Sequence, residues 1–315
     1  MLAWLLFPFL NFISFTFAQD EYILKPISET WIDDKSCTTV ALVFSPLQNT
    51  TFAVVQESLQ NNITSRALYV ESNPSVRLCA AAVNYRDEIL QNALLSEYSV
   101  IMIMAPKVLG TVKSFKKLPK NFEILDIGLG CGTFRTFWRS KFTSVSITSI
   151  EFDPAIAYIA KTWYGAVESN NSKIIVADGV EFVKTNTKKY DAIFLDACTN
   201  SPDSDLICPD PSFLKDDVIS QFRDSLKPVG CIVMNCFSLK SVGKDILIQR
   251  VKTTFERFFK FCFLLKVKNS DFNKVLACTN GPLPLEGIKN QYVIDYFKTV
   301  PPYTLIVESA NTTTI

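Results

Sequence analysis

Residues 122–132 read FEILDIGLGCG, and this stretch decides the fold. The first half is an apolar run typical of a buried strand, and Gly128, Gly130 and Gly132 follow it directly. Glycine allows a tight turn and brings backbone N–H groups close to a ligand. Glycines alone are weak evidence, because strand-to-helix turns often need them. The pattern predicts a strand, a tight turn and a helix that begins after Gly132.

The chain that follows repeats this alternation of strands and helices. Helices are expected from about Asp153, over 213–226 and over 240–256, and two last strands are close enough to form a hairpin. We therefore predict an α/β fold with a Rossmann-like sheet, parallel except for a terminal antiparallel hairpin strand, within residues 85–282. Its strands are expected at 122–128, 145–151, 173–178, 190–196, 230–237, 260–267 and 273–279.

The residues before this domain have another pattern. Short β-branched and aromatic runs at 38–45, 51–56 and 66–71 predict a small antiparallel β module within residues 19–84. An apolar helical pattern covers 85–109, and residues 283–315 are expected to form a C-terminal tail.

Acidic residues end four of the predicted strands: Asp126, Glu151, Asp178 and Asp196. Open α/β sheets bind ligands at the carboxyl ends of their strands. There Glu151 can accept hydrogen bonds from both ribose hydroxyls of an adenosine. Asp178, followed by Gly179, can accept a hydrogen bond from the adenine amino group. The alternative is that each acid only caps the helix after it.

These acids also separate two cofactor classes. A dinucleotide carries a pyrophosphate, whereas S-adenosylmethionine carries an ammonium and a carboxylate in its place. Asp126 before the first glycine, with further acids on strands three and four, suits S-adenosylmethionine.

Composition excludes several classes of function. The chain has no histidine, which excludes Ser-His-Asp hydrolysis, histidine-bound metals and a histidine general base. Lys and Arg number 32 against 31 Asp and Glu, so no nucleic-acid partner is expected. The nine cysteines lack C-x-x-C spacing, and no metal site is expected.

The N-terminus indicates the secretory route. Residues 1–17 carry no charge, and Thr16 and Ala18 suit a signal peptidase, so we expect a signal peptide over 1–18 and a secreted or lumenal protein. An uncleaved anchor is the rival and the only expected contact with a membrane. Glycosylation sequons begin at Asn49, Asn62, Asn170 and Asn311.

The cysteine count is odd, so at least one thiol stays outside an intrachain disulfide. Cys198 with Cys208, which bracket a loop, and Cys37 with Cys79, in the N-terminal module, are our disulfide candidates. The alternative is that these cysteines are small buried apolar residues.

The motifs DIGLGCGTF, IEFDPAI, KTWYG, VADGVEFV and YDAIFLDA occur in the order found in spermidine-synthase-like proteins. The chain most resembles the spermidine-synthase-like half of the translation-elongation-factor methyltransferase group, a class I S-adenosylmethionine-dependent family. The resemblance covers about 120–280 and includes Cys208-Pro209-Asp210-Pro211 after strand four. It implies that Asp126 and the three glycines surround the amino-acid part of the cofactor, and that Asp196 borders the sulfonium pocket.

The chain departs from the aminopropyltransferases of this superfamily at their amine-binding acids. Ser201 stands where a second aspartate would follow Asp196, and the acidic segments D-G-x-x-Q and D-E-x-x-Y are missing. We therefore expect an N-methyltransferase with an amine-bearing protein or small molecule as partner. An aminopropyltransferase and a secreted non-catalytic protein are the alternatives, and a homodimer is left open. Asp196 is the expected catalytic residue, ahead of Tyr164 and Asp203.

Overall fold

The computed structural model describes residues 23–24, 30–32, 35–58, 64–115, 118–199, 204–238, 243–267 and 273–283. The predicted signal peptide lies outside the described residues, as do most of the predicted tail, Ser201, Asp203, Asn62 and Asn311. Within the described part, no helix combines the length and the apolar character needed to span a bilayer.

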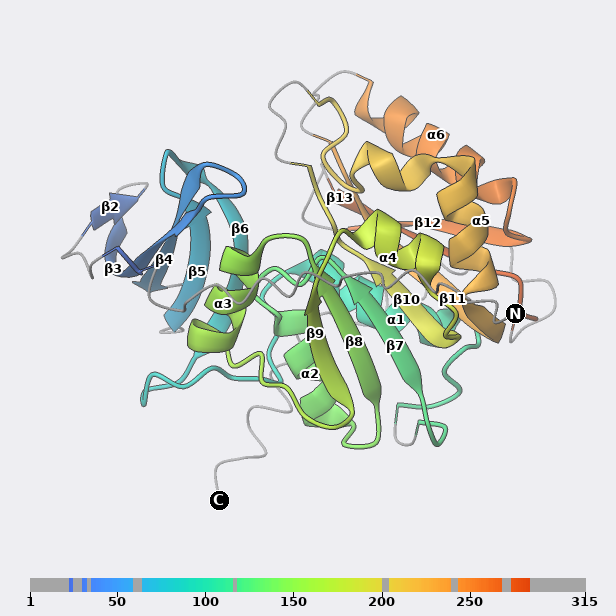
Figure 1. Ribbon diagram of the computed structural model, residues 1–315, viewed down its shortest axis with the longest axis horizontal. Helices are drawn as coiled ribbons and strands as arrows, with labels where there is room; N and C mark the ends of the chain where they lie inside the picture. Colours follow the sequence, from blue (N-terminus) through green and yellow to red (C-terminus); the bar gives the residue numbers. More distant parts are fainter. Residues whose placement is uncertain are drawn as a thin grey trace, which may run out of the picture.

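A seven-stranded sheet carries the larger part of the fold (Figure 1). Its order is β12-β13-β11-β10-β7-β8-β9, parallel from β11 to β9 and antiparallel at β13 and β12. The chain order reverses between the central strands β7 and β10, which is where open α/β sheets bind ligands. The strands are β7 (Glu123–Ile127), β8 (Ser146–Glu151), β9 (Ser172–Val176), β10 (Tyr190–Leu195), β11 (Leu226–Phe237), β12 (Phe261–Lys266) and β13 (Asn273–Thr279).

Helices cover both faces of this sheet. Successive residues of β7 enter opposite cores: Ile124 packs with Trp138 of α2, and Leu125 belongs to the cluster that holds Phe222 of α5 and Phe255 of α6. A central strand covered on both faces is apolar throughout, which explains the unbroken run around residue 124. The helices are α1 (Glu97–Val108), α2 (Thr133–Lys141), α3 (Pro154–Trp163), α4 (Gly179–Thr185), α5 (Asp216–Asp224) and α6 (Lys244–Glu256).

The N-terminal module is an antiparallel sheet of order β1-β3-β4-β5-β6, with β2 paired to β3. It packs on α3, which lies between the two sheets in Figure 1, through an apolar cluster that includes Val43, Phe52 and Ile156. The strands are β1 (Ile23–Leu24), β2 (Thr30–Ile32), β3 (Lys35–Ser45), β4 (Thr50–Ser58), β5 (Thr64–Val70) and β6 (Asn73–Val83).

The alternation of β7 to β11 and the β12–β13 hairpin are confirmed, but two predictions differ. The helix expected over 85–109 begins only at Glu97, because the Asn84 side chain accepts backbone hydrogen bonds from Arg86 and Glu88 and forms a turn. The helix expected over 213–226 is a 3-10 turn at Pro211–Leu214 followed by α5. Strand β6 was not predicted, because proline and alanine are poor strand formers.

Candidate cofactor and acceptor site

The glycine-rich loop lies at the carboxyl end of β7. Gly128, Gly130 and Gly132 have φ angles of 91°, 51° and 70°, in the left-handed region that favours glycine. At Gly128 a Cβ would lie 2.5 Å from the backbone oxygen of Asp196, so only glycine lets the ends of β7 and β10 come this close. The structure thus brings the predicted cofactor loop directly against the predicted catalytic residue.

Two predicted acids lie beside this loop, and neither caps a helix. Glu151 ends β8 and accepts hydrogen bonds from the backbone N–H groups of Gly130 (3.2 Å) and Asp153 (3.0 Å). Asp153, not Glu151, is the cap of α3. Asp126 is buried in β7 and accepts a hydrogen bond from Ser149 Oγ at 2.9 Å.

The third acid behaves differently. Asp178 caps α4 by accepting hydrogen bonds from the backbone N–H groups of Val180 (2.7 Å) and Glu181 (3.2 Å), which is the capping alternative considered above. Gly179 is buried, and a Cβ there would lie 2.9 Å from Ile127 Cγ2. At this strand end, helix capping and close packing account for both residues.

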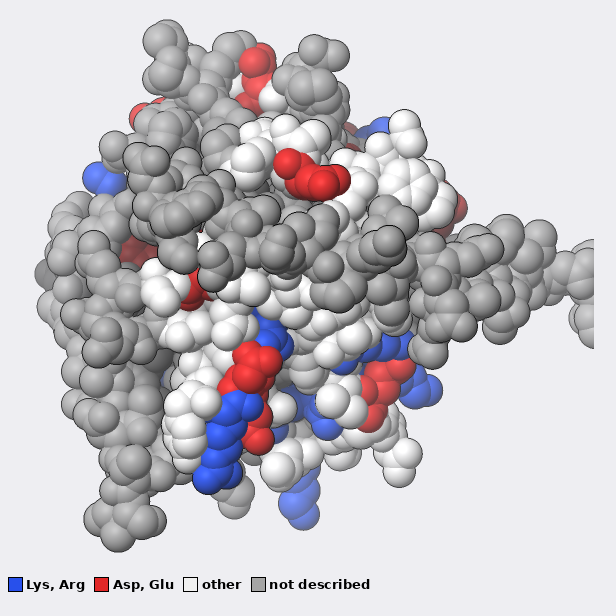
Figure 2. Space-filling view, turned by 90° about the vertical axis from the view of Figure 1, so that its left-hand side faces the viewer, with Lys and Arg blue, Asp and Glu red and all other residues white. Residues whose placement is uncertain are grey.

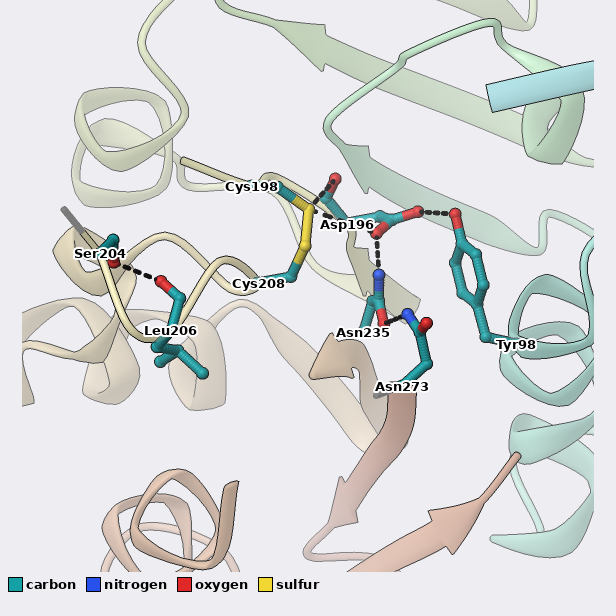
Figure 3. The surroundings of a disulfide bond; sticks show 8 residues. All are labelled: Tyr98, Asp196, Cys198, Ser204, Leu206, Cys208, Asn235 and Asn273. Carbon is teal, nitrogen blue, oxygen red and sulfur yellow. Dashed lines mark hydrogen bonds between the residues drawn. A yellow bond between two sulfur atoms is a disulfide. The ribbon is translucent and has the colours of Figure 1, made fainter. Parts of the chain in front are cut away.

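Asp196 is the centre of a polar cluster beyond the end of β10 (Figure 3). Its Oδ2 accepts a hydrogen bond from the Tyr98 hydroxyl at 3.0 Å, and its Oδ1 accepts one from Asn235 Nδ2 at 2.8 Å. Asn273 Nδ2 donates in turn to Asn235 Oδ1 at 3.0 Å, which fixes the orientation of the Asn235 amide. Three distant elements, α1, β11 and β13, therefore hold one carboxylate in place.

The sequence reasoning missed Tyr98, Asn235 and Asn273, because their convergence depends on the tertiary fold. The weaker catalytic candidate, Tyr164, is buried in the cluster between the N-terminal sheet and α3. It belongs there to the same apolar cluster as Ile159, at the junction of the two parts of the chain.

Three disulfides lie within the described residues. Cys198–Cys208 is confirmed and lies beside Asp196 in Figure 3, with the Cys198 sulfur 3.9 Å from Asp196 Oδ1. The predicted pairing of Cys79 with Cys37 is wrong, because Cys79 bonds to Cys131 inside the glycine-rich loop. The third disulfide, between Cys262 and Cys278, joins β12 to β13 and was not predicted.

The geometry explains the Cys79 correction. Cys79 lies on β6 at the face that packs on the main domain, whereas Cys37 belongs to another apolar cluster of the module. Near Asp196, the carboxylate and the sulfurs of Cys198 and Cys208 lie within 4.8 Å of one another. Both sulfurs are committed to the disulfide, so they offer no thiolate to a metal ion.

Burial changes the protonation of the three interior acids. Burial raises the pKa of Asp126 and of Glu151 to about 7, against hydrogen bonds from Ser149 and from backbone N–H groups that lower it. Burial likewise raises the pKa of Asp196 to about 6, although Asn235 and Tyr98 donate to it. Burial and the nearby Asp196 charge raise the pKa of Tyr98, so its hydroxyl stays protonated and remains a donor.

These pKa values predict opposite pH responses of cofactor affinity and stability. Protonation would remove the Asp126 charge that is expected to pair with the cofactor's ammonium group, and one acceptor site that Glu151 is expected to offer the ribose hydroxyls. The affinity for S-adenosylhomocysteine should therefore fall roughly tenfold from pH 8 to pH 6 for each acid involved. An acid whose pKa is higher in the folded state than in the unfolded state stabilises the fold at a pH below the unfolded-state pKa. This stabilisation is lost as the pH rises through the folded-state pKa of about 7. The ligand-free protein should therefore melt at a lower temperature at pH 8 than at pH 5.5.

Calorimetric titration and thermal unfolding at matched ionic strength measure the two responses. The variant Glu151→Gln should bind S-adenosylhomocysteine more weakly at pH 8 and show a flatter pH dependence, because one of the two titrating acids is gone. A dissociation constant that stays level between pH 6 and pH 8 in the wild-type protein would contradict the assignment of these acids to the cofactor.

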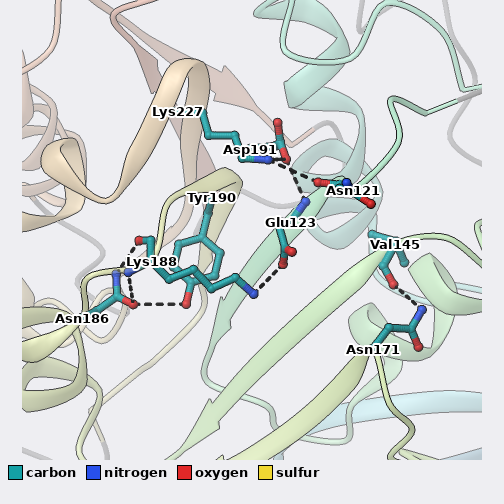
Figure 4. Close-up of polar contacts among 9 residues, drawn as sticks. All are labelled: Asn121, Glu123, Val145, Asn171, Asn186, Lys188, Tyr190, Asp191 and Lys227. Carbon is teal, nitrogen blue, oxygen red and sulfur yellow. Dashed lines mark hydrogen bonds and ion pairs between the residues drawn. The ribbon is translucent and has the colours of Figure 1, made fainter.

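A second polar network lies at the opposite, amino-terminal edge of the sheet (Figure 4). Asp191, at the start of β10, accepts hydrogen bonds from Lys227 Nζ at 2.6 Å and from the Glu123 backbone N–H at 2.7 Å. The Glu123 carboxylate pairs with Lys188 at 2.6 Å. These ion pairs join the starts of three strands, so β10 carries a structural acid at one end and Asp196 at the other.

Comparisons with known proteins find similarity to methyltransferases. Residues 77–207 match the family model of protein-L-isoaspartate (D-aspartate) O-methyltransferases, which covers the cofactor half of the sheet. The human eEF1A lysine and N-terminal methyltransferase is 24% identical over 195 residues, or 60% of this chain and 27% of that protein. The chain thus spans about a quarter of the length of this relative.

Two solved structures share the fold. Human methyltransferase-like protein 13, in complex with SAH, has a TM-score of 0.50 and 20% identity over 65% of this chain and 90% of its own. A probable spermidine synthase from Corynebacterium glutamicum has a TM-score of 0.60 and 13% identity over 87% of each chain. The predicted resemblance and fold are confirmed: the chain is similar in sequence to S-adenosylmethionine-dependent methyltransferases and in fold to a spermidine synthase, with a Rossmann-like sheet behind an N-terminal β module.

Proposed function

We propose that the chain is an S-adenosylmethionine-dependent methyltransferase that N-methylates an amine on a protein or small molecule in the secretory pathway. The observation that carries the proposal is the position of Asp196, a doubly hydrogen-bonded carboxylate whose backbone contacts the cofactor loop at Gly128. The residues at the loop fit S-adenosylmethionine, because the buried carboxyl groups of Asp126 and Glu151 lie there and neither caps a helix.

The chain's own residues supply binding, orientation and a proton acceptor. Bound S-adenosylmethionine would supply an activated methyl group, so the protein needs mainly to align the acceptor. Tyr98 and Asn235 each donate to one oxygen of Asp196, and each oxygen keeps a lone pair for an amine N–H. With its pKa near 6, Asp196 is ionised at neutral pH and can orient an amine or take its proton.

The same cluster argues against polyamine synthesis. A diamine carries two ammonium groups, and each needs an anionic partner when it leaves water. Among the side chains drawn in Figure 3, the partners of Asp196 are a phenol and an amide, and a disulfide lies beside it, so these contacts present a single carboxylate to an amine. The relative named above as a lysine and N-terminal methyltransferase also acts on single amines of a protein.

A two-donor assay tests the reaction type. The purified protein is incubated with S-adenosylmethionine and a panel of lysine-bearing peptides, free N-terminal peptides and small amines, and in parallel with decarboxylated donor and putrescine. We expect S-adenosylhomocysteine in the first series and no spermidine in the second. Spermidine formation would replace methylation with aminopropyl transfer. Binding of S-adenosylhomocysteine without product in either series would support the non-catalytic alternative.

The proposal of a secretory location has two structural supports. Disulfides persist in oxidising compartments, and the fold brings six of the nine cysteines into three of them. Two sequon asparagines are exposed in turns, Asn49 between β3 and β4 and Asn170 before β9. In the lower part of the face shown in Figure 2, the described Lys and Arg side chains lie among Asp and Glu side chains.

Expression of the full chain in a eukaryotic cell tests the compartment. We expect loss of residues 1–18 and a mass that falls on glycosidase treatment, because signal cleavage and sequon glycosylation both occur on the secretory route. Asn170→Gln should remove one glycan, whereas Asn171→Gln keeps the sequon Asn-x-Ser and should not. An intact N-terminus without glycans would contradict the location, and an intact N-terminus with glycans would favour an anchor.

A further inference from the structure

The N-terminal module contacts the cofactor site at two places. Cys79 of β6 forms a disulfide with Cys131, which lies between Gly130 and Gly132 in the glycine-rich loop. Separately, Ser45 and Gln48 of the module each donate a 2.6 Å hydrogen bond to Asp153 Oδ2. The backbone N–H of Asp153 donates to Glu151, the expected ribose ligand.

The two contacts act on different parts of the site. The hydrogen bonds to Asp153 and the apolar cluster of Val43, Phe52 and Ile156 dock the module on α3 without help from the disulfide. The disulfide attaches the glycine-rich loop covalently to the module. Gly130 and Gly132 on either side of Cys131 have positive φ angles and no side chain, so Cys131 is the side chain through which this part of the loop is bonded to the module.

The loop conformation also matters for the ribose acid. The Gly130 backbone N–H donates to Glu151 Oε2 at 3.2 Å, and Gly132 N–H donates to the Leu129 carbonyl at 2.7 Å. Movement of Cys131 would therefore displace both the backbone groups of the loop and a hydrogen bond to Glu151. Fixing the loop before binding lowers the entropy that the cofactor must remove.

We propose that Cys79 and Cys131 are positioning residues for the cofactor, so that the N-terminal module holds the glycine-rich loop in its binding conformation through their disulfide. The bond gives the protein a cofactor affinity that depends on its redox state. A dithiol reductant transfers two electrons and its two thiol hydrogens to the bond, which leaves two cysteine thiols and the oxidised, cyclic form of the reductant. The inference rests on cofactor binding and not on the methyl acceptor.

The test measures S-adenosylhomocysteine affinity by calorimetry beside thermal unfolding, with and without dithiothreitol. A variant with Cys198, Cys208, Cys262 and Cys278 all changed to alanine retains the Cys79–Cys131 disulfide alone. Reduction of this variant should weaken binding roughly tenfold, the effect of freeing about one residue's backbone. The double variant Cys79→Ala/Cys131→Ala should bind that weakly in both conditions and lose its response to reductant.

The double variant Cys262→Ala/Cys278→Ala is the matched control. It removes a buried disulfide of the β12–β13 hairpin, far along the sheet from β7, so it should lower the melting temperature and leave oxidised affinity unchanged. Equal affinity of oxidised and reduced four-alanine protein would overturn the inference, even if Cys79→Ala/Cys131→Ala failed to fold. Failure of the oxidised wild type to bind would instead contradict the proposed function.

Discussion

Replacing Asp196 with asparagine is expected to lower the rate of methyl transfer by about 10²–10⁴, the usual contribution of a positioned general base. Asparagine has almost the same shape: its amide oxygen can accept from Asn235 Nδ2, and its NH2 can donate to the Tyr98 hydroxyl oxygen, so the cluster in Figure 3 should remain assembled. It lacks the negative charge that would orient an amine and accept its proton. S-adenosylhomocysteine affinity should change little, because the loss falls on the acceptor side of the site.

The matched control is Asp191→Asn, at the other end of the same strand. Asp191 holds Lys227 in the network of Figure 4, so this variant should lower the melting temperature and leave turnover near the wild-type value. Steady-state rates with the best acceptor from the two-donor assay measure the difference. Equal rate losses in both variants would mean that Asp196 acts only through stability, and a fully active Asp196→Asn would remove it from the mechanism.

The site was predictable where it depends on order along the chain. Glycines after a buried strand, and acids at successive strand ends, define the cofactor edge of a parallel sheet because every such strand ends at the same edge. Asp126, Glu151 and Asp196 therefore fall near the loop in the structure as expected. The sequence could not separate Asp178 from a helix cap, because capping and ligand binding favour the same residue at the same position.

The unpredicted features depend on contacts between distant segments. Tyr98 is 98 residues from Asp196, and Asn235 is 39 residues away, so no local spacing pairs them. The disulfide partner of Cys79 was likewise hidden, because it depends on how the N-terminal sheet docks on the main domain. Cys37 was the predicted partner because both cysteines lie in the N-terminal module. Only the packing of this module on α3 shows that Cys79 faces the glycine-rich loop.

Replacing Gly128 with alanine is expected to lower the free energy of unfolding by about 3–5 kcal/mol, since backbone strain and overpacking act together. The φ angle of 91° is one that alanine rarely adopts. The new Cβ would lie 2.5 Å from the Asp196 carbonyl oxygen and 2.7 Å from the Ala197 nitrogen. Both are backbone atoms that cannot rotate away, so the end of β10 must move and take the Asp196 side chain with it.

Gly130→Ala is the control two residues further along the same loop. Its φ of 51° also lies in the left-handed region, but the nearest atom to a Cβ there is Cys79 Sγ at 3.9 Å, an ordinary contact. This variant should lose only about 1–2 kcal/mol, the cost of the left-handed conformation for an L-residue. Urea unfolding measures the free energy of unfolding of both variants. Their difference separates the effect of the close backbone contact from that of the left-handed φ angle. Similar losses of stability would show that the β7–β10 contact can relax, and Asp196 would then not depend on Gly128 for its position.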